Sequence, residues 1–237
     1  MIRARPSAAN DPNSRSTERV AEKTELLKVN LGCGTRWKSD WANLDGGPWT
    51  KLLWLRSLRV LDPILPATLR NYPRDLIAWD FRRLPLPFAD NSASAVFSQY
   101  ALEYLNPAEV MRCLQDCRRI LAPGGVIRLC QTDIPAMIEI YLRESYVAHT
   151  PRAVRRAGEF LENVAGEHTR LFVRLFRRGG VQQLFDAPSL EWLLTEAGFT
   201  DICFHSIHEG ECPDLEELEA EWRCPLIRVE ARSRRRV

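Results

Sequence analysis

Short apolar runs alternate with amphipathic segments of helical period along most of the chain. Five runs have the length and composition of buried strands: Lys28–Leu31, Trp41–Asp45, Leu76–Trp79, Ala93–Ser98 and Val126–Cys130. The helix between the last two is expected to begin at Asn106, because Pro107 suits a first turn and Glu109 stands at the capping-box position. This alternation predicts a parallel sheet covered on both faces.

The rest of the chain divides into a helical stretch and a second alternating stretch. Residues 134–185 have helical patterns, and residues 186–237 add a helix and two strand-like runs, Ile202–Ile207 and Leu226–Ala231. Residues 1–25 are polar and predict a disordered arm. We therefore expect an α/β fold with a doubly wound, mostly parallel seven-stranded sheet and helices on both faces. Residues 26–133 would form its first half, 134–185 a helical insertion that acts as a lid, and 186–237 the part that completes the sheet.

The composition is that of an ordinary globular protein: 45% of the 237 residues are apolar, 27% are charged and the net charge is +2. This balance argues against binding nucleic acid through bulk charge. No apolar run is long enough to span a bilayer and residues 1–25 lack a secretory signal, so we expect no integral membrane segment and a cytoplasmic location. Cys113 and Cys117 share a helical face, but no further ligand completes a zinc site, so we expect reduced thiols and no metal.

Groups suited to ligand binding follow three successive strand-like runs. Two glycines in Asn30–Gly34 follow the first run and allow a tight turn that a ligand can approach closely. Trp37 stands where a dinucleotide fingerprint needs its third glycine, and no P-loop lysine follows. Asp45 ends the second run and suits ribose hydroxyls, whereas Asp80 ends the third and suits an exocyclic amine. An ordinary turn is the alternative at each position, but in a parallel sheet these ends meet at one edge.

Four stretches together resemble class I S-adenosylmethionine-dependent methyltransferases: VNLGCG, WANLDG, DFRRLPLPFADNSASAVFSQYALEYL and CLQDCRRILAPGGVIRLCQTD. The resemblance covers residues 27–134 and, more loosely, 186–232, and it is closest to bacterial methyltransferase domains with a short link after the glycine turn. It implies that residues 26–133 bind S-adenosylmethionine and that residues 134–185 form an acceptor lid. The implied cofactor-binding residues are Asn30, Gly32, Cys33, Gly34, Asp45, Asp80, Phe81, Ser98 and Gln99. Of these, the turn Gly32–Gly34 together with Ser98 and Gln99 would meet the methionine part, Asp45 the ribose, and Asp80 with Phe81 the adenine.

The chain departs from the pattern of these methyltransferases in two places. Asp45 stands only 11 residues after Gly34, so the usual helix between them is shortened to about one turn. Tyr100 and Tyr104 stand where the resemblance leads us to expect histidines. This second departure argues against histidine chemistry at the end of the fourth strand.

The reaction itself makes modest demands on the protein. Methyl transfer from a sulfonium is an in-line displacement, and a base is needed only for a hydroxyl or a protonated amine. The candidate catalytic residues are His168 in the predicted lid and Asp133 after the fifth strand, and both are expected, with Tyr100, to bind the acceptor. The lid has more arginines than glutamates, which favours an acidic or phosphorylated acceptor or, alternatively, indicates only a solvated helix face.

The expected function is methyl transfer to a small-molecule, glycan or natural-product acceptor in biosynthesis. One alternative is a non-catalytic partner subunit of the same fold, which the intact glycine turn and both acids disfavour. Another is a nucleotide-dependent oxidoreductase, which the missing third glycine disfavours. The sequence leaves open whether the chain forms an oligomer.

Overall fold

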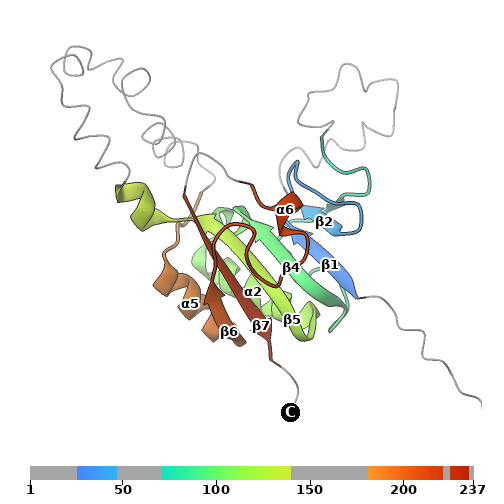
Figure 1. Cartoon of the computed structure of the whole chain (residues 1–237). Helices are drawn as coiled ribbons and strands as arrows, with labels where there is room; N and C mark the ends of the chain where they lie inside the picture. Colours follow the sequence, from blue (N-terminus) through green and yellow to red (C-terminus); the bar gives the residue numbers. More distant parts are fainter. Residues whose placement is uncertain (1–25, 47–70, 140–180, 221–224, 235–237) are drawn as a thin grey trace, which may run out of the picture.

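The computed structural model describes residues 26–46, 71–139, 181–220 and 225–234. They form a seven-stranded sheet in the order β3-β2-β1-β4-β5-β7-β6 (Figure 1). The strands are β1 (Leu27–Leu31), β2 (Ala42–Asp45), β3 (Ile77–Ala78), β4 (Ala93–Gln99), β5 (Leu121–Thr132), β6 (Phe199–Phe204) and β7 (Leu226–Ser233). The first five are parallel, and β7 is antiparallel to both of its neighbours. The strand order reverses between β1 and β4, where such sheets bind ligands.

The two longer helices begin where the local sequence can cap them. The helix α2 (Pro107–Ile120) starts behind Asn106, whose side chain accepts a hydrogen bond from the Glu109 N–H while the Glu109 carboxylate accepts one from the Asn106 N–H. The helix α5 (Ala187–Glu196) starts behind Asp186 in the same way. The shorter helical segments are the 3-10 helix η3 (Ala101–Tyr104), α6 (Leu215–Leu218) and residues 134–139.

Different elements cover the two faces of the sheet (Figure 1). On one face, α2 and α5 bury Leu114 and Leu190 in a core that includes the strand residues Val96 and Leu129. On the opposite face, residues from the connection between β6 and β7 bury the strand side chains. The members of this second core are Trp41, Ala95, Phe97, Val126, Cys130, Cys212, Leu215 and Leu218, with Leu226 packed against them.

The connection between β6 and β7 lies beside the short link between β1 and β2. That link, residues 32–41, is shorter than the dozen or so residues that a helical crossover usually takes. Asp214 of the connection accepts hydrogen bonds from Lys28 and Trp41, both at 2.8 Å, and from Lys38. Residues 205–220, which we call the β6–β7 connection, thus cover the sheet where a crossover helix would otherwise pack.

The predicted fold class is confirmed, with a mostly parallel sheet of seven strands. The bounds differ most at β6, which we expected at Ile202–Ile207 and which begins at Phe199, directly after Gly198 ends α5 with φ +87°. The predicted arm and most of the predicted lid lie outside the described residues. In the part of the chain that the structure describes, no helix is long and apolar enough to cross a bilayer.

Candidate functional site

The glycine turn after β1 folds over the end of β2. The N–H groups of Gly32 and Cys33 donate to the Leu44 carbonyl at 2.9 and 3.0 Å. Gly32 has φ +76°, and a β-carbon on it would lie 2.4 Å from the Ala101 Cβ of η3. Gly34 has φ +52°, but nothing lies within 4 Å of a β-carbon at that position. Glycine is therefore favoured at position 32 by both conformation and packing, and at position 34 by conformation alone.

Asp45, at the end of β2, is tied to the same turn. Its Oδ2 accepts a hydrogen bond from the Gly34 N–H at 2.8 Å, and the residue is only 9% exposed. The Asp45 carbonyl accepts a hydrogen bond from the Trp79 N–H at 3.0 Å, which continues the pairing of β2 and β3. The pairing brings Asp80 to the same edge of the sheet as Asp45.

Asp80 forms an ion pair with Arg82 just after β3. The Asp80 Oδ1 lies 2.9 Å from the Arg82 Nε and accepts a second hydrogen bond from the Arg82 N–H at 3.1 Å. The hydrogen bond from the Arg82 side chain lowers the pKa of Asp80, although burial opposes it. Asp80 is therefore an ionised acceptor at neutral pH. The ring of Phe81 lies 3.7 Å from the place that a Gly32 β-carbon would take.

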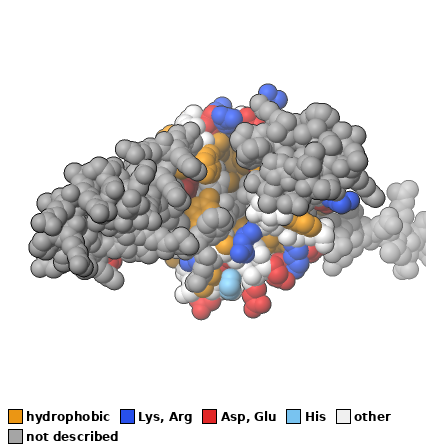
Figure 2. Space-filling model, turned by 90° about the horizontal axis from the view of Figure 1, so that it is seen from above, with side chains coloured by type: hydrophobic (Ala, Val, Ile, Leu, Met, Phe, Trp, Pro, Cys, Tyr) orange, Lys and Arg blue, Asp and Glu red, His pale blue; other side chains and the backbone are white. Residues whose placement is uncertain are grey.

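These groups line a cavity of about 580 Å³ at the carboxyl ends of the strands. This volume lies within the usual range for small-molecule and cofactor sites. Figure 2 shows hydrophobic side chains gathered near the middle of the face seen from above. The described residues that line the cavity are Gly32, Asp45, Gly46, Tyr72, Asp80, Phe81, Arg82, Gln99, Tyr100, Ala101, Tyr104, Leu105 and Gln182.

Tyr100 and η3 form a further part of the cavity wall. Tyr100 joins β4 to η3 with φ +64°, a conformation that bulky residues rarely adopt, and its N–H donates to the Cys130 carbonyl at 2.9 Å. Glu103 anchors η3 to β5, because its carboxylate accepts the Thr132 N–H at 2.7 Å. Burial raises the pKa of Glu103, which is 1% exposed. The Glu103 carbonyl also accepts the Gln182 N–H at 2.7 Å, so η3 holds Gln182 at the cavity.

Five of the nine predicted cofactor-binding residues line the cavity: Gly32, Asp45, Asp80, Phe81 and Gln99. Gly34 is linked to the cavity through its hydrogen bond to Asp45. Asn30 is buried and donates to the Arg36 carbonyl at 3.0 Å, so it holds the loop that follows the turn.

Cys33 and Ser98 are also absent from the described lining of the cavity. Cys33 is buried, and burial raises the pKa of its thiol. Ser98 is fully buried, and within the described ranges its hydroxyl has no hydrogen-bond partner. Side chains alternate along a strand, so Ser98 shares the α2 face with Val96 while Gln99 takes the other face.

The three predicted acceptor-binding residues have different positions. Tyr100 lines the cavity. Asp133 does not belong to the described lining, and its Oδ1 accepts the Ala136 N–H at 3.1 Å at the start of the helical residues 134–139. His168 lies outside the described residues, so its role stays a prediction.

Several residues that line the cavity could not be predicted from the sequence. Tyr72 and Gln182 come from stretches without a motif, and only the folded chain brings them to the strand ends. Arg82 lies in the run that carries the resemblance, and its pairing with Asp80, two residues away, could have been suggested from that spacing. Burial raises the pKa of Tyr72 to about 12, so it presents a neutral hydroxyl group at physiological pH.

The cavity fits the cofactor that the resemblance implies. Asp45 and Asp80 supply two carboxylates, one suited to ribose hydroxyls and one to the adenine amine. Phe81 supplies an apolar ring, and Gly32 exposes its backbone without a side chain. Arg82 is the one cation in the described lining and is paired with Asp80, so the lining suits a ligand without phosphates.

A match to a protein-family model agrees with this fit. Residues 29–129 match a family model described as a methyltransferase domain. The chain also aligns with a SAM-dependent methyltransferase structure from Thermotoga maritima at 14% identity and TM-score 0.48, covering 89% of this chain and 83% of that one. A Methanosarcina mazei methyltransferase structure aligns at 16% identity and TM-score 0.48, covering 90% and 95%. One from Mesorhizobium loti aligns at 20% identity and TM-score 0.46, covering 87% and 90%. No curated protein matches the chain's sequence significantly.

Proposed function

We propose that the chain, whose residues 29–129 match a methyltransferase domain, is a class I S-adenosylmethionine-dependent methyltransferase that methylates a small-molecule, glycan or natural-product acceptor by in-line transfer. The observation that carries this proposal is the make-up of the cavity. Apart from Asp45, Asp80 and Arg82, all the described residues that line it are uncharged. The first two are assigned to the cofactor and the third is paired, so hydroxyl, amide and apolar groups remain for the acceptor. Within the described lining, this supports a neutral, compact acceptor over a highly charged one. The arginines of the predicted lid, which would favour an acidic acceptor, lie outside the described residues.

S-adenosylmethionine supplies a methyl group on a sulfonium, which needs alignment with the acceptor atom more than chemical activation. We assign cofactor binding to residues 26–133, with Asp45 holding the ribose and Asp80 and Phe81 the adenine. We assign acceptor binding to Tyr100 and to residues 134–185. Gln182 supports the second assignment, because it brings the end of that segment to the cavity.

A base is required only where the acceptor carries a hydroxyl or a protonated amine. We propose His168 for this role, since it belongs to the segment between β5 and α5 that supplies Gln182. Asp133 follows β5 directly, but the structure gives its carboxylate a capping role.

Two experiments test the proposal. Calorimetry should show binding of S-adenosylmethionine and S-adenosylhomocysteine but not of NAD, whose diphosphate the lining does not suit. S-adenosylhomocysteine release should then be screened over neutral hydroxyl and amine acceptors, with carboxylated and phosphorylated analogues of the same scaffolds as the matched set. We expect turnover with the neutral members. Turnover confined to the anionic analogues would contradict the proposed acceptor class.

A further inference from the structure

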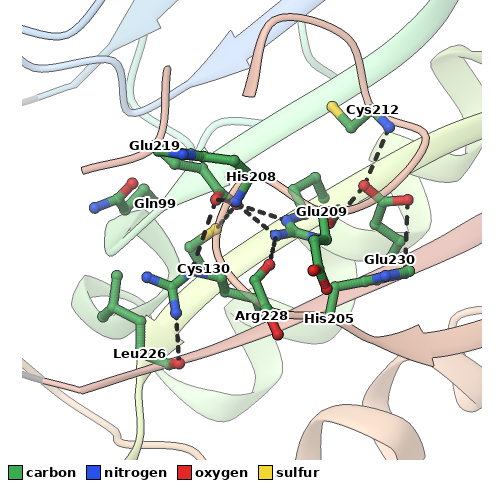
Figure 3. A network of polar contacts seen from close by, with 12 residues as sticks. Gln99, Cys130, His205, His208, Glu209, Cys212, Glu219, Leu226, Arg228 and Glu230 are labelled. Atoms are coloured by element: carbon green, nitrogen blue, oxygen red, sulfur yellow. Dashed lines mark hydrogen bonds and ion pairs between the residues drawn. The ribbon is translucent and has the colours of Figure 1, made fainter. Parts of the chain in front are cut away.

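Glu219 lies where the β6–β7 connection meets two strands (Figure 3). Its Oε1 accepts hydrogen bonds from the Arg128 Nε at 2.7 Å and the Cys130 Sγ at 3.1 Å, both on β5. Its Oε2 accepts the His208 N–H at 2.7 Å and lies 3.6 Å from the Arg228 Nε of β7. One carboxylate therefore binds the connection to both strands.

The same residue reaches the glycine-turn loop through its backbone. The Glu219 carbonyl accepts a hydrogen bond from the Arg36 Nη1 at 2.9 Å. Arg36 itself follows the glycine turn, and its N–H donates to the Cys33 carbonyl at 2.9 Å. Both the side chain and the backbone of Glu219 are thus fixed from outside the connection.

The next residue, Ala220, holds Gln99 at the cavity. The Gln99 Nε2 donates to the Ala220 carbonyl at 3.3 Å, and the Gln99 Oε1 accepts the Ala220 N–H at 3.2 Å. A glutamine amide has two N–H groups and two acceptor lone pairs. This two-way pairing uses one of each and fixes which end of the amide is which. The remaining N–H and lone pair belong to a side chain that lines the cavity.

Burial makes Glu219 a rigid support. Arg128 is fully buried and Glu219 is 2% exposed, so neither charge can be released to water cheaply. Removing one partner of such a pair leaves an uncompensated buried charge, which strongly opposes any displacement of Glu219. The position of Ala220 is therefore determined by the core of the protein and not by the mobility of its own loop.

We propose that Glu219 is a positioning residue of the methyltransferase site: through Ala220 it presents the Gln99 amide to the bound cofactor in one fixed orientation. The inference rests on the proposed function in one respect: it assumes that Gln99 contacts the methionine part of bound S-adenosylmethionine. The β6–β7 connection, which contains no recognised motif, would thus help to determine the shape of the cavity.

Glu219→Gln tests the proposal, and Glu230→Gln is its matched control. Glu230 is the other buried glutamate beside Arg128, and it also accepts two backbone hydrogen bonds, from Glu211 at 2.7 Å and Cys212 at 3.1 Å. In both variants the NH2 group of the new glutamine would replace a carboxylate oxygen that accepts hydrogen bonds, and it would face N–H groups that also donate. Both variants should therefore have a lower melting temperature. Only the Glu219 variant should move Ala220 and with it Gln99.

The first readout is the side-chain amide signal of Gln99 in the ligand-free protein, measured by NMR. We expect slow proton exchange in the wild type and in Glu230→Gln, and fast exchange in Glu219→Gln. The second readout is the Kd for S-adenosylhomocysteine, which Glu219→Gln should raise about three- to tenfold, the value of one neutral hydrogen bond. Glu230→Gln should stay within about twofold of the wild type, a change below the effect of one such bond.

Equal effects of the two variants on the Gln99 signal or on the Kd would overturn the proposal, because they would indicate general loosening. If Glu219→Gln fails to fold, Gln99→Glu replaces it. A carboxylate at position 99 cannot donate to the Ala220 carbonyl, and this variant leaves the buried pair of Arg128 and Glu219 unchanged. Gln99→Glu should raise the Kd at least as much, and an unchanged Kd would also overturn the proposal. A wild type that protects the Gln99 amide and binds S-adenosylhomocysteine, yet methylates no neutral acceptor, would contradict only the proposed function.

Discussion

The Gly34 N–H lies 2.8 Å from the Asp45 Oδ2, so the acid assigned to the ribose is also a partner of the glycine turn. A substitution at either residue therefore alters the hydrogen bonding of the other. The two predicted cofactor contacts therefore act as one structural unit, and experiments must separate lost ligand contacts from a displaced turn.

Asp45→Ala should weaken binding of S-adenosylhomocysteine by about 1–3 kcal/mol, the cost of leaving a polar group of the ligand without its partner. A 2′-deoxy analogue separates the two roles of Asp45. If Asp45 binds the ribose, the analogue should bind the variant about as well as the natural ligand does, while the wild type discriminates between them. Calorimetry with both ligands provides the measurement. Asp80→Ala is the control, and it should still bind S-adenosylhomocysteine more tightly than the 2′-deoxy analogue. If the Asp45 variant discriminates between the two ligands as strongly as the wild type does, Asp45 does not bind the ribose.

Gly32→Ala and Gly34→Ala form a matched pair, because both residues have positive φ but only Gly32 faces a neighbour. We expect Gly34→Ala to lower the free energy of unfolding by about 1–2 kcal/mol through backbone strain. Gly32→Ala should cost more and should also weaken the cofactor, because the new β-carbon meets the Ala101 Cβ and displaces η3. Chemical denaturation and calorimetry on both variants provide the test. Similar stability losses would indicate that packing against Ala101 is unimportant.

Asp133→Asn separates helix capping from acid–base chemistry. Asparagine caps helices about as well as aspartate, so this variant should keep the fold, and we expect its turnover to remain close to that of the wild type. Asp133→Ala removes the acceptor for the Ala136 N–H and should cost about 1 kcal/mol of stability. A fall in kcat by a factor of about 10²–10⁴ in Asp133→Asn would instead assign the base to Asp133.

His168→Gln should lower kcat by a factor of about 10²–10⁴ if the acceptor needs a general base. Its Kd for S-adenosylmethionine should hardly change, since His168 is assigned to the acceptor side. His149→Gln is the matched control, because His149 belongs to the same predicted segment. This variant should leave kcat unchanged. Wild-type turnover in His168→Gln would mean that positioning alone drives the transfer.

Asp214 should make the stability of the protein fall in acid. Hydrogen bonds from Lys28 and Lys38 lower its pKa in the folded state, so its contribution to stability is complete above the unfolded value of about 4 and is lost as the pH falls toward the folded value. Denaturation curves from pH 7 down to pH 3 should therefore show a loss that Asp214→Asn reduces. Asp90→Asn is the control, because Asp90 is 69% exposed in its pair with Arg119. The same acid profile in the wild type and in Asp214→Asn would contradict this prediction.

The sequence predicted those parts of the molecule that local chemistry determines. The capped start of α2 depends on residues three positions apart, and the acids Asp45 and Asp80 stand at the carboxyl ends of strands whose apolar runs are readable. Ser98 shows where such reasoning fails. It is adjacent to Gln99 in the same motif, but alternation along β4 points it into the α2 face.

The remaining features depend on contacts between distant residues. Arg128 and Glu219 are 91 residues apart, and no sequence pattern links them. Gln182 is held at the cavity by two carbonyls of η3, that of Glu103 through its backbone N–H and that of Tyr104 through its side chain. No periodic pattern records such pairings, so Tyr72, Gln182 and the β6–β7 connection could not be assigned to the site from the sequence.

The placement of the β6–β7 connection also has a consequence for biosynthesis of the chain. Trp41 and Phe97 leave the ribosome long before Cys212, Leu215 and Leu218, the residues that cover them. One face of the nascent sheet is therefore exposed to water or to chaperones until nearly all of the protein has been made. Contacts of such long sequence separation slow folding and prolong exposure of apolar surface. Truncation before residue 212 should thus leave an aggregation-prone fragment and not a free-standing cofactor-binding half.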